Sequence, residues 1–188
     1  VSVLPGSYTL KLAYAGDTSS ASIEVKFDPR LDWSMDVLKG KYDALKALES
    51  DLELAVGHLE QLKEKIKIID KMTSRMKDKD EDGFEEELKI SKELKDTLNT
   101  FIDQYLGKED KRQGITAEQP NNISNYYGAA YWYTSNASHA PTATETALAE
   151  KFRKESEILN KKVDDFLSEE WPKYKEKVEG VDVSPFKD

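Results

Sequence analysis

The spacing of apolar residues changes once along the chain, at Asp28-Pro29-Arg30, and this change constrains the fold more than any other sequence feature. Before it, apolar residues recur at every second position, which is typical of a β-strand with one buried face. After it, they recur every three or four positions over more than forty residues, which is typical of a long amphipathic helix. The sequence therefore predicts a β segment over residues 1–30 and a helical domain over residues 31–188.

Two strands joined by a loop are predicted within the β segment. Pro5-Gly6 is the turn signal that opens the segment, and the loop is expected around Gly16-Asp17. A two-stranded hairpin is only marginally stable by itself. We therefore expect it to pack on the helices or on strands upstream of Val1, as the end of a larger β-sandwich. Its predicted apolar face consists of Tyr8, Leu10, Leu12, Ile23, Val25 and Phe27.

The first predicted helix begins near Ser34, whose hydroxyl can cap free backbone amides. Two apolar rows run along it, each with a seven-residue repeat, as expected for the seam of a helical bundle. The rows are Leu38, Leu45, Leu52, Leu59 and Ile66, and Leu48, Ala55, Leu62, Ile69 and Met76.

Three shorter predicted helices follow. The second ends at Gly107, and the third covers Ile123 to Thr134. The fourth opens with the capping-box spacing of Thr142 and Glu145, and we expect Pro172 to kink or restart it. The predicted fold is thus mainly α: an antiparallel up-and-down four-helix bundle with one very long helix, preceded by a β-hairpin.

Composition excludes several classes of function. The formal net charge is −9, and no run of Lys or Arg exceeds two residues, so we expect no nucleic-acid partner. The absence of cysteine removes disulfides, thiolate nucleophiles and Cys-ligated zinc. No apolar run approaches membrane-spanning length, so we expect no membrane insertion.

Four short segments occur in a recognisable order along the chain. They are the strand Pro5-Gly6-Ser7-Tyr8-Thr9, the strand end Phe27-Asp28-Pro29-Arg30, and the later Gln113-Gly114-Ile115 and Pro141-Thr142. This series resembles the C-terminal region of bacterial sortilin-like, neuraminidase-repeat (BNR) β-propeller proteins, where a β-sandwich is followed by a helical bundle. The Asp-box pattern of the propeller, S-x-D-x-G-x-T-W, is absent. The resemblance implies an exported accessory domain, periplasmic or secreted, whose partner is the upstream β domain of the same protein. It implies nothing about catalysis.

A cation site is suggested most closely by Asp78, Asp80 and Asp82, which with Gly83 match the first half of an EF-hand loop. The second half does not match, because Lys89 stands where a bidentate carboxylate is required. The alternative is an acidic turn between helices, in which negative charge near a helix N-terminus is favourable. We therefore expect no metal and no cofactor.

The densest aromatic stretch is a candidate ligand surface, although its residues can equally fill the end of the bundle. An exposed aromatic patch would favour ligand binding. At helical spacing, Tyr127 and Tyr131 share one side with Ala130 and Thr134. The candidate residues are Tyr126, Tyr127, Tyr131, Trp132 and Tyr133.

Catalytic patterns are missing from the sequence. His58 and His139 are far apart, and neither H-E-x-x-H nor G-x-S-x-G occurs. We therefore expect no enzyme but a non-catalytic accessory or interaction domain that supports or assembles a larger protein. The alternative is a carbohydrate- or peptide-binding module that uses residues 126–133.

Overall fold

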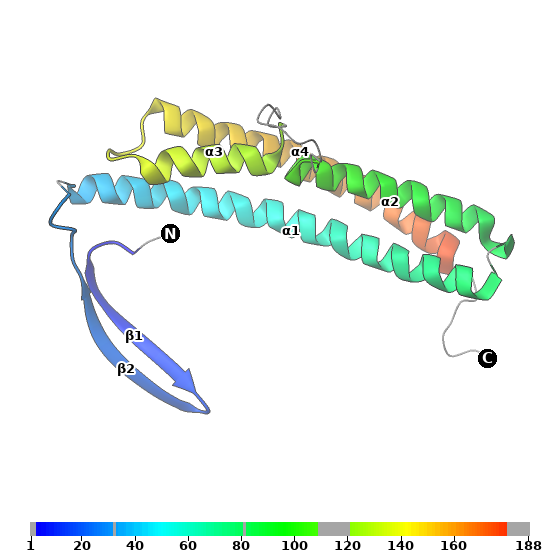
Figure 1. Cartoon of the computed structure of the whole chain (residues 1–188), viewed down its shortest axis with the longest axis horizontal. Coiled ribbons are helices and arrows are strands. Elements are labelled where there is room, and N and C mark those ends of the chain that lie inside the picture. Colours follow the sequence, from blue (N-terminus) through cyan, green and yellow to red (C-terminus); the bar gives the residue numbers. More distant parts are fainter. Residues whose placement is uncertain (1–2, 32, 81, 109–120, 180–188) are drawn as a thin grey trace, which may run out of the picture.

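The computed structural model describes residues 3–31, 33–80, 82–108 and 121–179. Four helices and one two-stranded antiparallel sheet make up this part of the chain (Figure 1). The mainly α fold with a preceding hairpin is therefore confirmed. No helix of the described residues is long and apolar enough to cross a membrane, as the sequence predicts. The Gln113-Gly114-Ile115 part of the resemblance lies outside the described residues.

The hairpin pairs β1 (Gly6–Tyr14) with β2 (Asp17–Val25) along their whole length. Its turn consists of Ala15 and Gly16, whose φ angles of 50° and 92° are both positive. Two consecutive residues of positive φ match the right-handed twist of the strands and allow the shortest hairpin connection. The register places Tyr8 opposite Ile23 and Leu10 opposite Ala21, so the apolar side chains share one face, as predicted.

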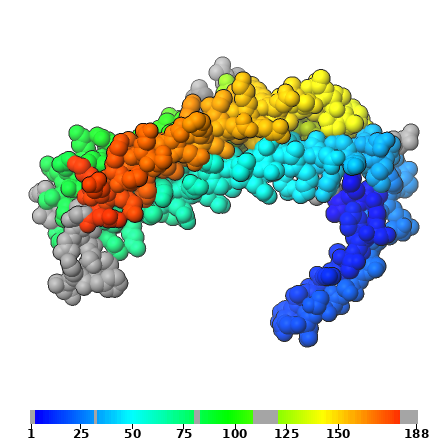
Figure 2. Space-filling view, turned by 180° about the vertical axis from the view of Figure 1, so that it is seen from behind, coloured from blue at the N-terminus to red at the C-terminus, as the bar shows by residue number. Residues whose placement is uncertain are grey.

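This apolar face is not covered by the bundle. The hairpin projects away from the N-terminal end of the helical rod (Figures 1 and 2). Leu12 is 72% exposed and Tyr14 is 81% exposed, while only the strand ends near Tyr8 and Val25 are partly buried. The sequence left open whether the helices or other strands cover the hairpin, and in this structure the helices do not.

The first helix, α1 (Met35–Asp80), is the axis of the molecule. The Ser34 Oγ accepts a hydrogen bond from the Val37 amide at 3.3 Å, which fixes the predicted start. One predicted apolar row is entirely buried, from Leu48 through Leu62 to Met76, and the other row, apart from the buried Leu59, is half-buried beside it. The helix thus owes its length to a continuous apolar row that neighbouring helices cover.

The other helices are α2 (Glu85–Leu106), α3 (Ile123–Asn136) and α4 (Ala143–Glu179). Two contacts give the direction of α4 relative to α1. Arg153 of α4 donates to Asp51 of α1 at 2.9 Å, and further along both helices Asp164 of α4 lies 3.1 Å from His58 of α1. Residue numbers rise in the same direction in both helices, so α4 runs parallel to α1. Helices α2 and α3 follow one another along this pair in the opposite direction (Figure 1). The predicted up-and-down order reverses direction at each connection, whereas here α2 and α3 run in the same direction, one after the other (Figure 1).

Helix ends and packing follow the sequence closely, with one correction. The Thr142 amide donates to Glu145 Oε2 at 2.8 Å, which is the hydrogen bond from the glutamate side of the predicted capping box of α4. Pro172 does not restart α4, because the helix runs unbroken through it. Trp171 and Tyr174, on either side of Pro172, pack into the core and hold this segment helical despite the missing amide donor.

Candidate functional site

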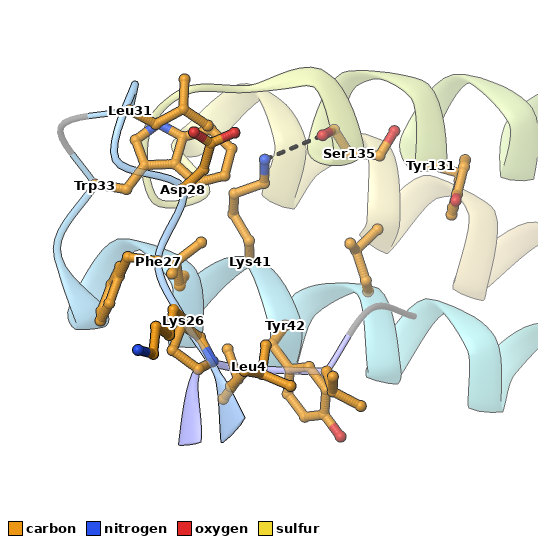
Figure 3. Close-up of a pocket in the computed structure, with 15 residues that line it drawn as sticks. Leu4, Lys26, Phe27, Asp28, Leu31, Trp33, Lys41, Tyr42, Tyr131 and Ser135 are labelled. Carbon is orange, nitrogen blue, oxygen red and sulfur yellow. Dashed lines mark hydrogen bonds between the residues drawn. The ribbon is translucent and has the colours of Figure 1, made fainter. Parts of the chain in front are cut away.

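A cleft of about 380 Å³ lies where the hairpin joins the bundle (Figure 3). We call it the junction cleft. Four segments contribute its walls: the stretch before β1, the exit from β2, the N-terminal part of α1 and the C-terminal part of α3. The lining side chains are mainly apolar and aromatic: Val3, Leu4, Pro5, Val25, Lys26, Phe27, Asp28, Leu31, Trp33, Leu38, Lys41, Tyr42, Leu45, Tyr131 and Ser135.

The predicted junction at Asp28-Pro29-Arg30 forms a hydrogen-bonded turn beside this cleft. The Leu31 amide donates to the Asp28 carbonyl oxygen at 3.1 Å. The Arg30 guanidinium donates through Nε and Nη2 to the two carboxylate oxygens of Asp28, at 2.9 and 2.6 Å. These side-chain hydrogen bonds lower the pKa of Asp28, and Pro29 fixes its own φ between the two residues. These contacts order the turn that follows β2.

Lys41 ties α1 to α3 across the cleft. Its Nζ donates to the carbonyl oxygens of Ser135 at 3.0 Å and Ala137 at 2.6 Å, and lies 4.6 Å from the centre of the Trp33 ring. Figure 3 shows the lysine reaching from α1 to the end of α3. An ammonium group at a helix C-terminus favourably meets the negative end of the helix dipole. Burial lowers the pKa of Lys41, consistent with a cation held mainly by carbonyl oxygens.

The walls of the junction cleft are mainly apolar. Its polar lining groups include the Asp28 carboxylate and the Lys41 ammonium, which are engaged in structural hydrogen bonds. The apolar walls fit an aliphatic or aromatic group.

The aromatic stretch divides into a packed part and an exposed part. Tyr127 packs edge-to-face on Phe152 with ring centres 5.5 Å apart and stacks on Tyr131 at 5.8 Å. Burial raises the pKa of Tyr127, as expected for a phenol at the edge of a core. Tyr126 is half-buried, with Lys151 Nζ 4.6 Å from its ring centre. These two tyrosines therefore fill the bundle.

The other three aromatic residues face solvent. Tyr131 is exposed at the mouth of the junction cleft, as Figure 3 shows. Trp132 is 60% exposed and Tyr133 is 48% exposed, with ring centres 5.1 Å apart and planes nearly perpendicular. An exposed aromatic patch was the criterion, stated in the sequence analysis, that would favour ligand binding over packing. The structure brings Trp132 and Tyr133 together but leaves Tyr126 and Tyr127 out of this surface.

The acidic stretch does not form an EF-hand loop. Asp78 belongs to the last turn of α1, which continues through residue 80, and a short 3₁₀ helix covers residues 82–84. Positions two apart on a helix do not face each other, so this backbone does not wrap around a cation. The side chains of Asp80 and Asp82 lie outside the described residues. Within the described part of the chain, no group of three His, Cys, Asp or Glu side chains could hold a metal ion.

The two histidines have separate structural settings. His58 lies between α1 and α4, with Nδ1 2.8 Å from the Leu54 carbonyl oxygen and Nε2 3.1 Å from Asp164 Oδ1. His139 lies in the α3–α4 connection, with Nδ1 2.8 Å from the Ala140 carbonyl oxygen. The sequence offered no reason to expect Asp164 beside His58, because only the parallel packing of α4 brings it close.

Sequence reasoning also missed the junction cleft. Its residues range from Val3 to Ser135, and only the aromatic character of Trp33 and Tyr42 beside the predicted junction could have pointed to it. Comparison with known proteins adds no assignment, because no family model, curated protein or solved structure matches this chain.

Proposed function

We propose that this chain is a non-catalytic interaction domain whose helical rod presents the hairpin for docking against a β-sheet. The observation that carries this proposal is the exposed apolar face of a hairpin that is regular over nine residues in each strand. Leucines and tyrosines occupy every second position of β1, so they lie on one face of the hairpin. A hairpin surrounded by solvent on both faces would not need such an apolar face.

Energetics support a partner for this face. Fully burying a leucine side chain contributes about 1.5–3 kcal/mol, and Leu10, Leu12 and Tyr14 are all exposed. The hairpin also has two open edges, and a two-stranded sheet without further support is marginally stable. A second sheet fits the face, because sheets pack through alternating inward side chains of the kind found on β1.

The junction supports the same proposal mechanically. The Asp28–Arg30 pair and Pro29 restrict the connection between the hairpin and α1, so the hairpin is not a loosely tethered arm. A rigid connection reduces the conformational entropy lost on docking. The helical rod would then hold or space the docked β domain within a larger assembly.

The resemblance names the partner as the upstream β domain of the same protein, an exported bacterial protein of the sortilin-like or BNR class. Periplasmic or secreted location is part of this proposal and rests on the resemblance alone. The net charge of −9 supports a protein partner over nucleic acid.

The test measures binding of the separately produced upstream β domain to this chain by calorimetry. Leu12→Lys places a charge on the apolar face and should weaken binding by roughly 30-fold or more, because about 2 kcal/mol of apolar burial is lost. Ser20→Lys is the matched control, since Ser20 pairs with Lys11 on the opposite face of the hairpin. Binding that resists Leu12→Lys, or that persists without residues 3–27, would contradict the proposal.

A second function is favoured by a different observation, the exposure of Trp132 and Tyr133 on α3. We propose ligand binding at this surface as the alternative, a carbohydrate- or peptide-binding module. It involves the helical rod rather than the hairpin, so Leu12→Lys should leave it unchanged.

A further inference from the structure

The composition of α3 sets it apart from the rest of the chain. None of its fourteen residues is charged, although charged residues make up 35% of the whole sequence. Beyond its buried positions it consists of tyrosine, tryptophan, serine, asparagine, glycine and alanine. Recognition surfaces favour Tyr and Trp, which provide large rigid contact area, and Ser, Gly and Asn, which provide adaptable hydrogen bonding.

The exposed rings of α3 form a corner rather than a flat patch. The planes of Trp132 and Tyr133 meet at 81°. Gly128 and Ala129 lie one helical turn before Trp132, on the same side of the helix. A Cβ atom added at Gly128 would have no neighbour within 4 Å, so the surface beside the indole is low and open.

A polar group borders the other side of the indole. Asn136 lies one turn after Trp132, and its Nδ2 donates to the Trp132 carbonyl oxygen at 2.8 Å. This hydrogen bond ties the amide to the backbone one turn after Trp132, and the Ser135 hydroxyl also donates to the same carbonyl oxygen. An aromatic ring, a low shelf and a fixed amide therefore lie in sequence along one side of α3, which we call the α3 platform (Gly128, Ala129, Trp132, Tyr133 and Asn136).

We propose that the α3 platform binds a neutral oligosaccharide or polysaccharide. This inference rests on the alternative function and names its ligand class. The C–H groups on one face of a sugar ring carry partial positive charge and can pack on the negative face of the indole. Sugar hydroxyls both donate and accept hydrogen bonds, which matches an amide and the phenol of Tyr133.

Charge and shape select against the other ligand classes. The platform has no cationic or anionic side chain of its own to pair with a uronate, a sulfate or a charged peptide. An extended peptide is usually captured by a sheet edge or a groove. The platform is the outer surface of a helix, whose backbone groups are already paired within the helix.

The test uses the full chain with a defined set of soluble probes: laminarin, xyloglucan and chitohexaose as neutral glycans, and alginate as an acidic one. Binding is measured by calorimetry, with tryptophan fluorescence as a second measurement. We expect at least one neutral glycan to bind and alginate not to bind. Trp132→Ala should weaken that binding about tenfold or more, because the stacking surface is lost.

Ile158→Ala is the matched control, since Ile158 is an exposed large apolar residue on α4 outside both proposed surfaces, and it should bind like the original chain. Circular dichroism would show that both variants remain folded. Failure of all neutral probes, or equal binding by Trp132→Ala, overturns the proposal.

A peptide selected by phage display that binds the original chain but not Trp132→Ala would separate the two levels of inference. In that outcome the ligand surface on α3 stands and the glycan assignment is wrong. Absence of both glycan and peptide binding rejects the alternative function as well.

Discussion

Replacing Leu62 with alanine tests the most basic structural inference, that one row of α1 forms the core. Leu62 is completely buried at the middle of this row, between Ala55 and Ile69. Leucine-to-alanine changes at such sites cost about 2–5 kcal/mol, from lost apolar transfer and the cavity left behind. For a chain of this size each kcal/mol lowers the melting midpoint by about 2–4 °C, so we expect a decrease of about 4–20 °C.

The matched control is Leu54→Ala on the same helix. Leu54 is 62% exposed, and the substitution changes the same atoms and the same helix propensity. Surface substitutions of this kind usually change stability by less than about 0.5 kcal/mol, which corresponds to about 2 °C at most. Thermal unfolding followed by circular dichroism at 222 nm measures both variants. Equal midpoints for the two would refute the assignment of the buried face.

Three further changes probe local features. Gly57→Ala should stabilise the protein by up to about 1 kcal/mol in urea unfolding, because Gly57 lies within α1 and an added Cβ meets nothing within 4 Å; a lower midpoint would contradict this. Ala15→Asn should increase amide protection across β1 and β2 in hydrogen exchange, since asparagine tolerates the positive φ at this position better than alanine; unchanged protection would count against the strained turn.

The hydroxyl and the amide of Thr142 donate hydrogen bonds to Glu145 and lower the pKa of its carboxyl group below the ordinary 4.5. The ionised carboxylate therefore stabilises the fold above pH 4.5, and this stabilisation is lost as the pH falls through the lowered pKa. Glu145→Gln should therefore melt earlier than the original chain at pH 7, and the difference should shrink as the pH falls through that lowered pKa. A difference that stays constant with pH would argue against the capping box.

Features set by local periodicity and capping could be predicted from the sequence. The seven-residue spacing from Leu48 to Met76 places these residues on one face whatever the partner helices are, and all of them are buried. Thr142 and Glu145 are close in sequence, so their hydrogen bond depends only on the local helix. The hairpin register follows from its two-residue turn in the same way.

Features set by long-range packing could not be predicted. The contacts of Asp51 with Arg153 and of Lys41 with Ser135 depend on which helices are neighbours and on their directions. The aromatic stretch shows the limit most clearly. Its periodicity separates two sides of α3 but does not reveal that α1 and α4 cover Tyr127 and leave Trp132 in solvent.

The two proposed contact surfaces lie at the same end of the molecule, and this placement has a physical reason. The Lys41 contacts bring the C-terminal end of α3 against the start of α1, next to the turn that leads to the hairpin. Away from this end, the surface of the rod carries ion pairs such as Lys177 with Glu86 and Lys161 with Asp165. Charged side chains are strongly hydrated and are depleted at the centres of interfaces, so such a surface resists association. The hairpin face and α3 are largely free of charge, and binding at this end would leave the hydrated remainder of the rod in solvent.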